Sequence, residues 1–290
     1  MLSRTWQMMT GRVPALAVAA LLLWCGAALA QTAAPAPAAA KAVAPATAPA
    51  PAADENVRDP KAMEILLRMA DYLAKAPALG VIVLSSYDAI QEDGEYIEFG
   101  DRRRIELLRP DRMRVDVERS DGDKGMLVFD GKAVTAFKPA DNVYAVVEKA
   151  GTVDAVLAYV VKDMQVPMPL ARLFTTTFPQ QLEKMVKSIA YVETNRLFDV
   201  PTDHLAVQSD EVDFQVWIAQ GDAPFPRRVI ITYKTAPGQP QFRAVLSDWS
   251  LAAADVGRFA FTPPAGAEKV PLVIPASERR PSAAQKGGAK

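Results

Sequence analysis

The sequence predicts an α+β fold: a curved antiparallel half-barrel sheet of about ten strands, covered by an N-terminal helix and a mid-chain helical insert. Short segments that alternate apolar and polar residues dominate the chain after residue 80. Tight turns join most of them, which favours antiparallel pairing of sequence neighbours. Two stretches with helical spacing interrupt this pattern. A long sheet with few helices must bury its apolar face, so we expect it to curl around them.

The first helix is predicted to begin at Pro60, because proline suits the first helical position, with Asp59 as its N-cap. Pro77 and Gly80 are expected to end it. Its apolar residues recur at helical spacing and are Met63, Leu66, Leu67, Ala70 and Leu73.

The strand-like segments form two groups, one on each side of the insert. In the first group, residues 112–119 alternate cleanly, and Asp130-Gly131 is a strong two-residue hairpin signal. The strands expected in this group are 81–91, 95–108, 112–119, 126–129, 132–138 and 143–147. Those expected in the second group are 189–194, 204–209, 212–219, 227–234 and 242–251.

The insert between these groups is predicted to be helical. Thr152 is a suitable cap for a helix over 153–164, and prolines at 167 and 169 end it. Shorter helices are expected over 170–174 and 179–186. The apolar stripe of the helix predicted over 153–164 consists of Val153, Val156, Leu157, Val160, Val161 and Met164.

Residues 1–30 have the pattern of a secretory signal peptide. Arg4 and Arg12 precede an apolar run, and a small-x-small motif ends at Ala30. The alternative is an uncleaved membrane anchor. A bacterial lipoprotein signal needs a small residue before its cysteine, whereas Trp24 precedes Cys25 here. We therefore expect a periplasmic protein, cleaved after Ala30 and not lipidated.

The remaining segments outside the domain are rich in small or polar residues. Of residues 31–53, 18 are Ala or Pro, which predicts a disordered linker because such a stretch offers little apolar surface to bury. An Ala-rich helix is the alternative, opposed by five prolines. Residues 275–290 are predicted to be a disordered tail, which leaves residues 54–274 for one folded domain.

The composition excludes several functional classes. A formal net charge of -1 argues against nucleic-acid binding, which usually needs a basic excess. One His and one Cys are too few for a zinc, haem or iron–sulfur site. Asp121 and Asp123 lack the further oxygen ligands of a calcium loop. No cofactor and no metal are therefore expected.

Several short motifs occur in a distinctive order. Leu107-Leu108-Arg109-Pro110 ends the second expected strand, Asp130-Gly131-Lys132 marks a hairpin, and residues 258–266 close the domain. These motifs resemble the periplasmic lipoprotein-carrier superfamily (LolA/LolB-like). A second, closer resemblance also includes Tyr144, His204-Leu205 and residues 167–173, 212–218 and 221–227. This closer resemblance is to a family of predicted periplasmic proteins of unknown function with that fold.

This resemblance implies that the concave sheet face and a helical lid enclose a cavity for a lipid or a lipoprotein acyl chain. The protein would then act as a carrier or chaperone without catalysis. It also implies that an arginine directly before a proline holds the lid closed, and Arg109 matches that position. The alternative for Arg109 is an ordinary surface ion pair at the end of a strand.

The candidate ligand-binding residues either alternate on one strand face or lie in the insert. A closed core that these side chains fill completely is the alternative. The strand candidates are Met113, Val115, Val117, Leu205, Val207, Phe214, Val216 and Ile218. The insert candidates are Leu157, Met164 and Phe174, whose flexible or aromatic side chains suit irregular apolar partners.

Two other functional classes remain open. His204 is the only imidazole and would be the base of an enzyme, although no nucleophile motif accompanies it. Trp217 and Trp249 would be the anchors of an interaction or stress-sensing module that contacts a membrane-bound envelope protein. If the protein is a carrier, its expected partner is a hydrophobic ligand or a lipoprotein. No nucleic-acid partner is expected.

Overall fold

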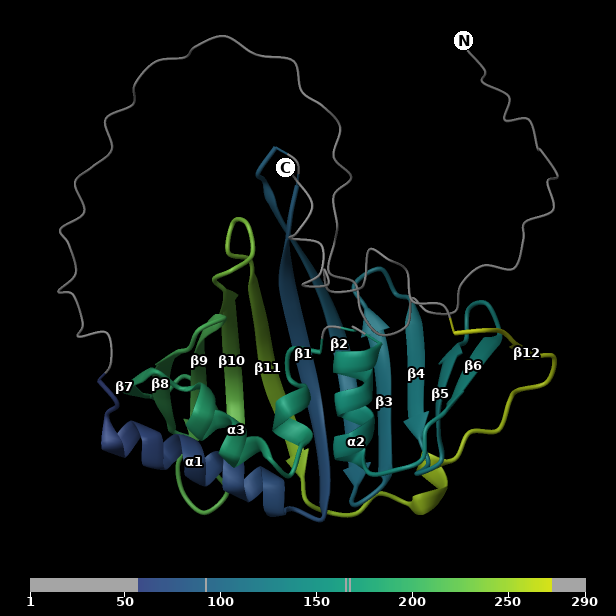
Figure 1. Cartoon of the computed structure of the whole chain (residues 1–290), viewed down its shortest axis with the longest axis horizontal. Coiled ribbons are helices and arrows are strands. Elements are labelled where there is room, and N and C mark those ends of the chain that lie inside the picture. The colour runs from purple at the N-terminus through teal and green to yellow at the C-terminus, as the bar shows by residue number, and fades with distance from the viewer. Residues whose placement is uncertain (1–56, 92, 165, 167, 273–290) are drawn as a thin grey trace, which may run out of the picture.

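The computed structural model describes residues 57–91, 93–164, 166 and 168–272, which form one curved sheet with helices against one face (Figure 1). The predicted signal peptide, linker and tail lie outside the described residues. Within the described ranges, no helix combines the length and the apolar character needed to cross a membrane.

The sheet has twelve strands in the order β12-β6-β5-β4-β3-β2-β1-β11-β10-β9-β8-β7, and it is open. Its strand pairs are antiparallel except the parallel pair β12–β6. The α+β class is therefore confirmed, whereas the strand count is twelve and not about ten. The strands are β1 Ala78–Ile90, β2 Tyr96–Leu108, β3 Arg112–Arg119, β4 Lys124–Phe129, β5 Ala133–Lys138, β6 Val143–Glu148, β7 Ser188–Asn195, β8 Thr202–Gln208, β9 Val212–Ala219, β10 Pro226–Tyr233, β11 Gln241–Ser250 and β12 Glu268–Lys269.

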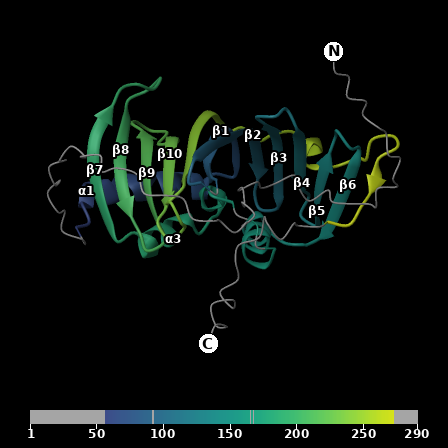
Figure 2. The same cartoon turned by 90° about the horizontal axis from the view of Figure 1, so that it is seen from above.

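All of the longer helices lie on the concave side of the sheet, as the view from above shows (Figure 2). The π-helical turn η2 directly continues α2, and the 3-10 turn η3 precedes α3. The helical segments are α1 Pro60–Lys75, α2 Val153–Ala158, η2 Tyr159–Asp163, η3 Ala171–Phe174, α3 Phe178–Met185 and the 3-10 turn η4 Val256–Phe259.

The single helix predicted over 153–164 is wrong in its second half. There the backbone N–H of Met164 bonds to the carbonyl of Tyr159 at 3.1 Å, one residue further back than in an α-helix. The wider turn rotates Met164 away from the apolar stripe of α2. Met164 instead packs near Val160 and Val166 in a small separate cluster.

The start of α1 follows the capping rule. The carboxylate of Asp59 accepts hydrogen bonds from the backbone N–H groups of Lys61 at 2.9 Å and Ala62 at 3.3 Å. The helix buries Leu66, Met69 and Leu73 against the sheet and the insert. Its apolar stripe thus covers part of the concave face.

The three residues before α1 fasten the β7 edge of the sheet. Arg58 forms a parallel bridge with Ile189, and the backbone N–H of Asp59 bonds to the carbonyl of Ile189 at 3.0 Å. The Arg58 guanidinium also donates to the carbonyls of Glu183 and Val186 at the end of α3. This segment therefore joins the sheet edge to α3.

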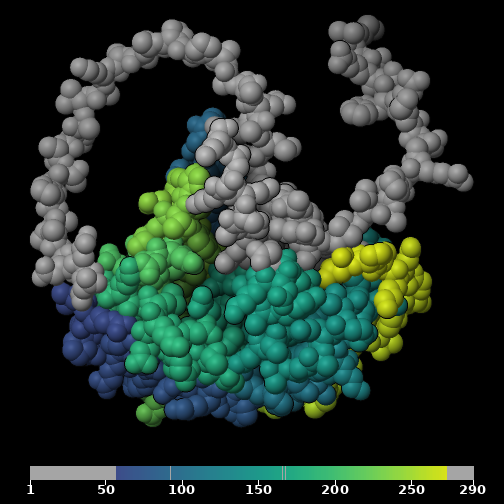
Figure 3. Space-filling view, viewed as in Figure 1, coloured from purple at the N-terminus to yellow at the C-terminus, as the bar shows by residue number. Residues whose placement is uncertain are grey.

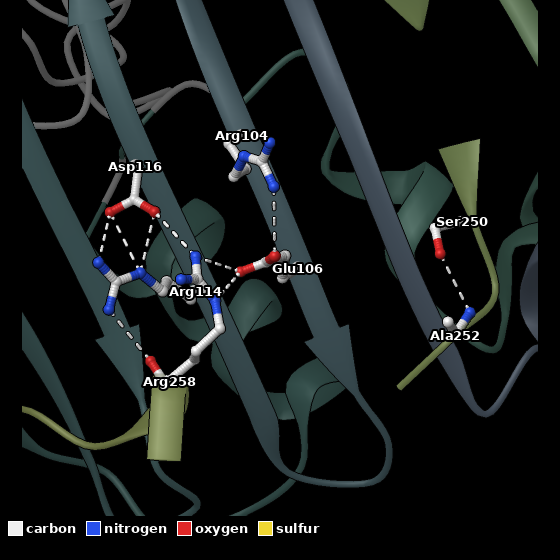
Figure 4. A network of polar contacts seen from close by, with 7 residues as sticks. All are labelled: Arg104, Glu106, Arg114, Asp116, Ser250, Ala252 and Arg258. Atoms are coloured by element: carbon white, nitrogen blue, oxygen red, sulfur yellow. Dashed lines mark hydrogen bonds and ion pairs between the residues drawn. The ribbon is translucent and has the colours of Figure 1, made fainter. Parts of the chain in front are cut away.

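The segment that follows β11 returns along the convex face, and Figure 4 shows its polar contacts. Arg258 lies 2.7 Å from Glu106 of β2, and Arg114 of β3 donates to the Arg258 carbonyl at 3.1 Å. Arg114 also pairs with Asp116 at 2.8 Å. The neighbouring Phe259 is 1% exposed, so η4 is anchored by both charge and burial.

Replacing Phe259 with Ala tests this anchor. We expect the free energy of unfolding to fall by about 3–5 kcal/mol, because the change deletes a buried ring and leaves a cavity. Urea denaturation followed by circular dichroism measures it. The matched control is Val256→Ala in the same turn, whose side chain is 61% exposed. Equal losses in the two variants would contradict the anchoring role of Phe259.

Candidate ligand-binding site

A cavity of about 760 Å³ lies between the helices and the β9–β10 part of the sheet. Exposed charged residues, including Arg172 and Glu211, line it together with buried apolar ones, so it reaches the surface. Figure 3 shows the helical face above it. The apolar lining comes from both layers and includes Leu66, Met69, Leu157, Leu170, Phe178, Leu182, Met185, Phe214, Val216, Val229, Ile231 and Tyr233.

The floor of this cavity follows from strand alternation. Val229 and Ile231 of β10 lie opposite Val216 and Phe214 of β9 in the sheet register. Successive side chains of a strand point to opposite faces, so these four side chains share the concave face. They form a continuous apolar surface that no helix covers completely.

A second, much smaller cavity of about 50 Å³ lies over the β1–β5 part of the sheet. Residues 168–171 and Leu157 line both cavities, so they form the partition between them. The small cavity has one polar corner, where Ser85 donates to Asp101 at 2.6 Å and Arg103 pairs with the same carboxylate. The remainder of its lining is mostly apolar.

The structure divides the predicted ligand-binding residues into four groups. Phe214 and Val216 line the large cavity, and Leu157 lines both cavities. Leu205, Val207 and Ile218 line neither cavity and are buried in the main core. Met164 lies outside that core. The fourth group lines only the small cavity and consists of Met113, Val115, Val117 and Phe174.

The prediction missed much of the large cavity. Its walls include Leu66 and Met69 of α1, Leu182 of α3, and Val229 and Ile231 of β10. The alternation along β10 could have identified Val229 and Ile231, since the side chains of both point to the concave face of the sheet. Which part of that face stays uncovered depends on where the helices pack, and spacing along the chain does not contain that information.

Arg109 lies where the sheet, α1 and α2 meet. Its guanidinium donates to the carbonyl of Ala76 at 3.0 Å and to that of Leu73 at 3.5 Å, at the C-terminal end of α1. It also lies 3.5 Å from the carboxylate of Asp154 in α2. The side chain is 12% exposed, so this is a buried junction and not the surface ion pair weighed as the alternative.

The same turn also holds both helices through its backbone. The N–H of Arg109 bonds to the carbonyl of Pro77, and the N–H of Val153 bonds to the carbonyl of Pro110, both at 2.8 Å. Asp154 extends the link, because it accepts the backbone N–H of Thr176 at 2.9 Å, two residues before α3. One turn therefore connects α1, α2 and the start of α3.

The electrostatics of Arg109 agree with this position. Burial lowers the pKa of its guanidinium below the ordinary value, and the negative charge of Asp154 opposes that shift. Arginine titrates so far above neutrality that the group stays charged. Two helix-terminal carbonyls and one carboxylate therefore stabilise a positive charge held largely away from water.

His204 lies on the opposite face of the sheet from the cavity. Its ring stacks on Trp217 with centroids 4.0 Å apart, and Nε2 lies 3.0 Å from the side-chain oxygen of Gln215. In the described part of the chain no group of three or more His, Cys, Asp or Glu residues could hold a metal.

The two tryptophans predicted as interaction anchors both have contacts within the domain. Trp217 is buried, and Trp249 donates to the carbonyl of Pro226 at 2.9 Å.

Several solved structures match this chain at low sequence identity. An uncharacterized conserved protein from Thermus thermophilus is 14% identical, with a TM-score of 0.43, over 73% of this chain and 99% of that one. The lipoprotein LppX of Mycobacterium tuberculosis is 12% identical, with a TM-score of 0.43, over 68% of this chain and 99% of that one. The LolA superfamily protein NE2245 from Nitrosomonas europaea is 10% identical, with a TM-score of 0.33, over 69% of this chain and 97% of that one. Similarities at this level do not transfer a ligand or a partner.

Sequence comparison assigns the family directly. No curated protein matches the chain. The profile of the family described as "Predicted periplasmic protein (DUF2092)" matches residues 62–273, which include the cavity, the Arg109 junction and the η4 anchor. This agrees with the family resemblance seen in the motifs. The chain therefore belongs to the DUF2092 family of predicted periplasmic proteins.

Proposed function

We propose that this protein binds a hydrophobic ligand, a lipid or the acyl chain of a lipoprotein, in the large cavity and carries or shields it in the periplasm without catalysing a reaction. The observation that supports this is the cavity itself, about 760 Å³ with a mostly apolar wall. Ligand sites typically have about 300–1,000 Å³ and a lining of this kind. A fully filled core would instead support the interaction-module alternative.

The shape of the lining favours an amphiphile. The apolar floor on β9 and β10 suits a hydrocarbon chain, since burying it removes apolar area from water. Charged and amide side chains, among them Arg172, Gln181 and Glu211, line the exposed part. A polar headgroup would remain there in contact with water and would not have to be desolvated.

In this proposal Arg109 controls access. Residues of α1, α2 and α3 all line the cavity, and the Arg109–Asp154 junction links these three helices. Opening the helical layer would break contacts of the guanidinium while the sheet stayed intact. Arg109 would thus set the rate of ligand release more than the stability of the sheet.

Blocking the floor of the cavity tests the binding site. We expect Ile231→Trp to weaken the binding of a fluorescent fatty acid by at least about tenfold, because the added ring occupies space needed by a large apolar group of the ligand. Fluorescence titration measures the affinity. Ile230→Trp is the matched control, since Ile230 is the adjacent strand residue and points to the other face. Binding that is equal in both variants and the original protein would contradict this site.

Removing the guanidinium tests the gate. We expect Arg109→Gln to release a bound fluorescent fatty acid about tenfold faster, because charge-assisted hydrogen bonds contribute about 1.5 kcal/mol or more. Stopped-flow displacement measures the rate. The control is Arg112→Gln, an arginine whose ion pair is with Asp111 of the same turn. A loss of folding stability in Arg109→Gln with an unchanged release rate would show a purely structural role.

A further inference from the structure

The centre of the convex face carries an unusual exposed row of side chains. Leu84 of β1 lies directly opposite Arg102 of β2 on one side and Val245 of β11 on the other. Val245 in turn lies opposite Arg228 of β10. The sheet register thus aligns Arg102, Leu84, Val245 and Arg228 across four neighbouring strands near the middle of the sheet.

The two aliphatic side chains of this row are open to solvent. Leu84 is 60% exposed and Val245 is 43% exposed, although both lie in central strands and not at an edge. The residues beside them in β1, Val83 and Ser85, are buried on the concave face. The exposed pair therefore contributes nothing to the core.

The arginines at the two ends of the row keep their charge available. Neither Arg102 nor Arg228 has a carboxylate partner among the described residues. Arg228 instead lies over the ring of Trp217, 5.1 Å from its centroid, at the next position along the same row. The row is therefore aliphatic in the middle with an arginine on each side. Beyond Arg228 it continues to the buried ring of Trp217, and beyond Arg102 it continues to Glu118 of β3, which pairs with Lys124 at 3.3 Å.

We infer that this convex row docks the protein on a membrane surface that contains anionic lipids. Arginines attract phosphate headgroups, while short aliphatic side chains between them enter the interface. A second copy of the chain is disfavoured, because it would present the same unpaired arginines and the like charges would repel. The row lines neither the 760 Å³ nor the 50 Å³ cavity, so the inferred surface is separate from the candidate ligand site.

The inference does not depend on the ligand cavity, since the convex row and the cavity lie on opposite faces of one sheet. It would bring the protein to a lipid surface with its helical face directed away from that surface. Membrane docking and cavity binding can therefore be measured separately.

Cosedimentation of the full chain with large vesicles tests the inference. We expect the protein to bind vesicles of phosphatidylcholine mixed with phosphatidylglycerol, and not vesicles of phosphatidylcholine alone. Salt should weaken this binding, because exposed charges are screened. Arg102→Gln and Arg228→Gln should each lower the affinity by about fivefold, and Leu84→Ser should lower it at unchanged charge.

The matched control is Arg68→Gln, which removes an exposed arginine of α1 that also has no carboxylate partner among the described residues. It should leave vesicle binding unchanged. The Arg102 and Arg228 variants should also keep their affinity for the fluorescent fatty acid. An unchanged affinity would show that they are folded and that cavity binding does not depend on the convex row. Absence of vesicle binding by the original protein, or an equal loss in Arg68→Gln, would overturn the inference.

Discussion

The concave face of this sheet has more apolar area than its helices can cover, and most of the structure follows from that mismatch. Twelve strands present one apolar face, while the helical layer consists of α1 and a few short segments of the insert. Where the helices pack closely, over β1–β5, the cavity lined by both layers has only about 50 Å³. Over β9 and β10 the cover is incomplete, and the large cavity results. The cavity is thus a product of uneven cover and not of unusual cavity residues.

Such a thin cover has to be fixed at few points. Arg109 joins the end of α1 to α2, and Arg58 joins the end of α3 to the β7 edge. In both cases a guanidinium satisfies backbone carbonyls at the end of a helix, where no intrahelical donor is available. The helical layer is therefore attached through its ends as well as through the buried apolar stripe of α1.

Much of the fold could be predicted from local signals, and the site only in part. Asp59 and Pro60 marked the start of α1, and Asp130-Gly131 marked the β4–β5 hairpin, because both are determined by neighbouring residues. The change to π-helical bonding at Tyr159 and the two-residue strand β12 depend on tertiary packing and were missed. Alternation correctly placed Val216 and Leu205 on the buried face. It could not tell that Val216 meets the cavity while Leu205 meets packed side chains, since that depends on helices distant in sequence.

The short pairing of Arg58 with Ile189 also affects how the protein behaves in a crowded compartment. A terminal strand such as β7 exposes backbone groups that can recruit another chain, which is a common start of aggregation. Here the residues just before α1 occupy the first part of that edge, and an irregular register between Tyr191 and Glu193 interrupts the next part. The segment that leads into the domain therefore also acts as its edge protection. Shortening the chain to the first residue of α1 would remove this cover and leave β7 open to edge-to-edge association.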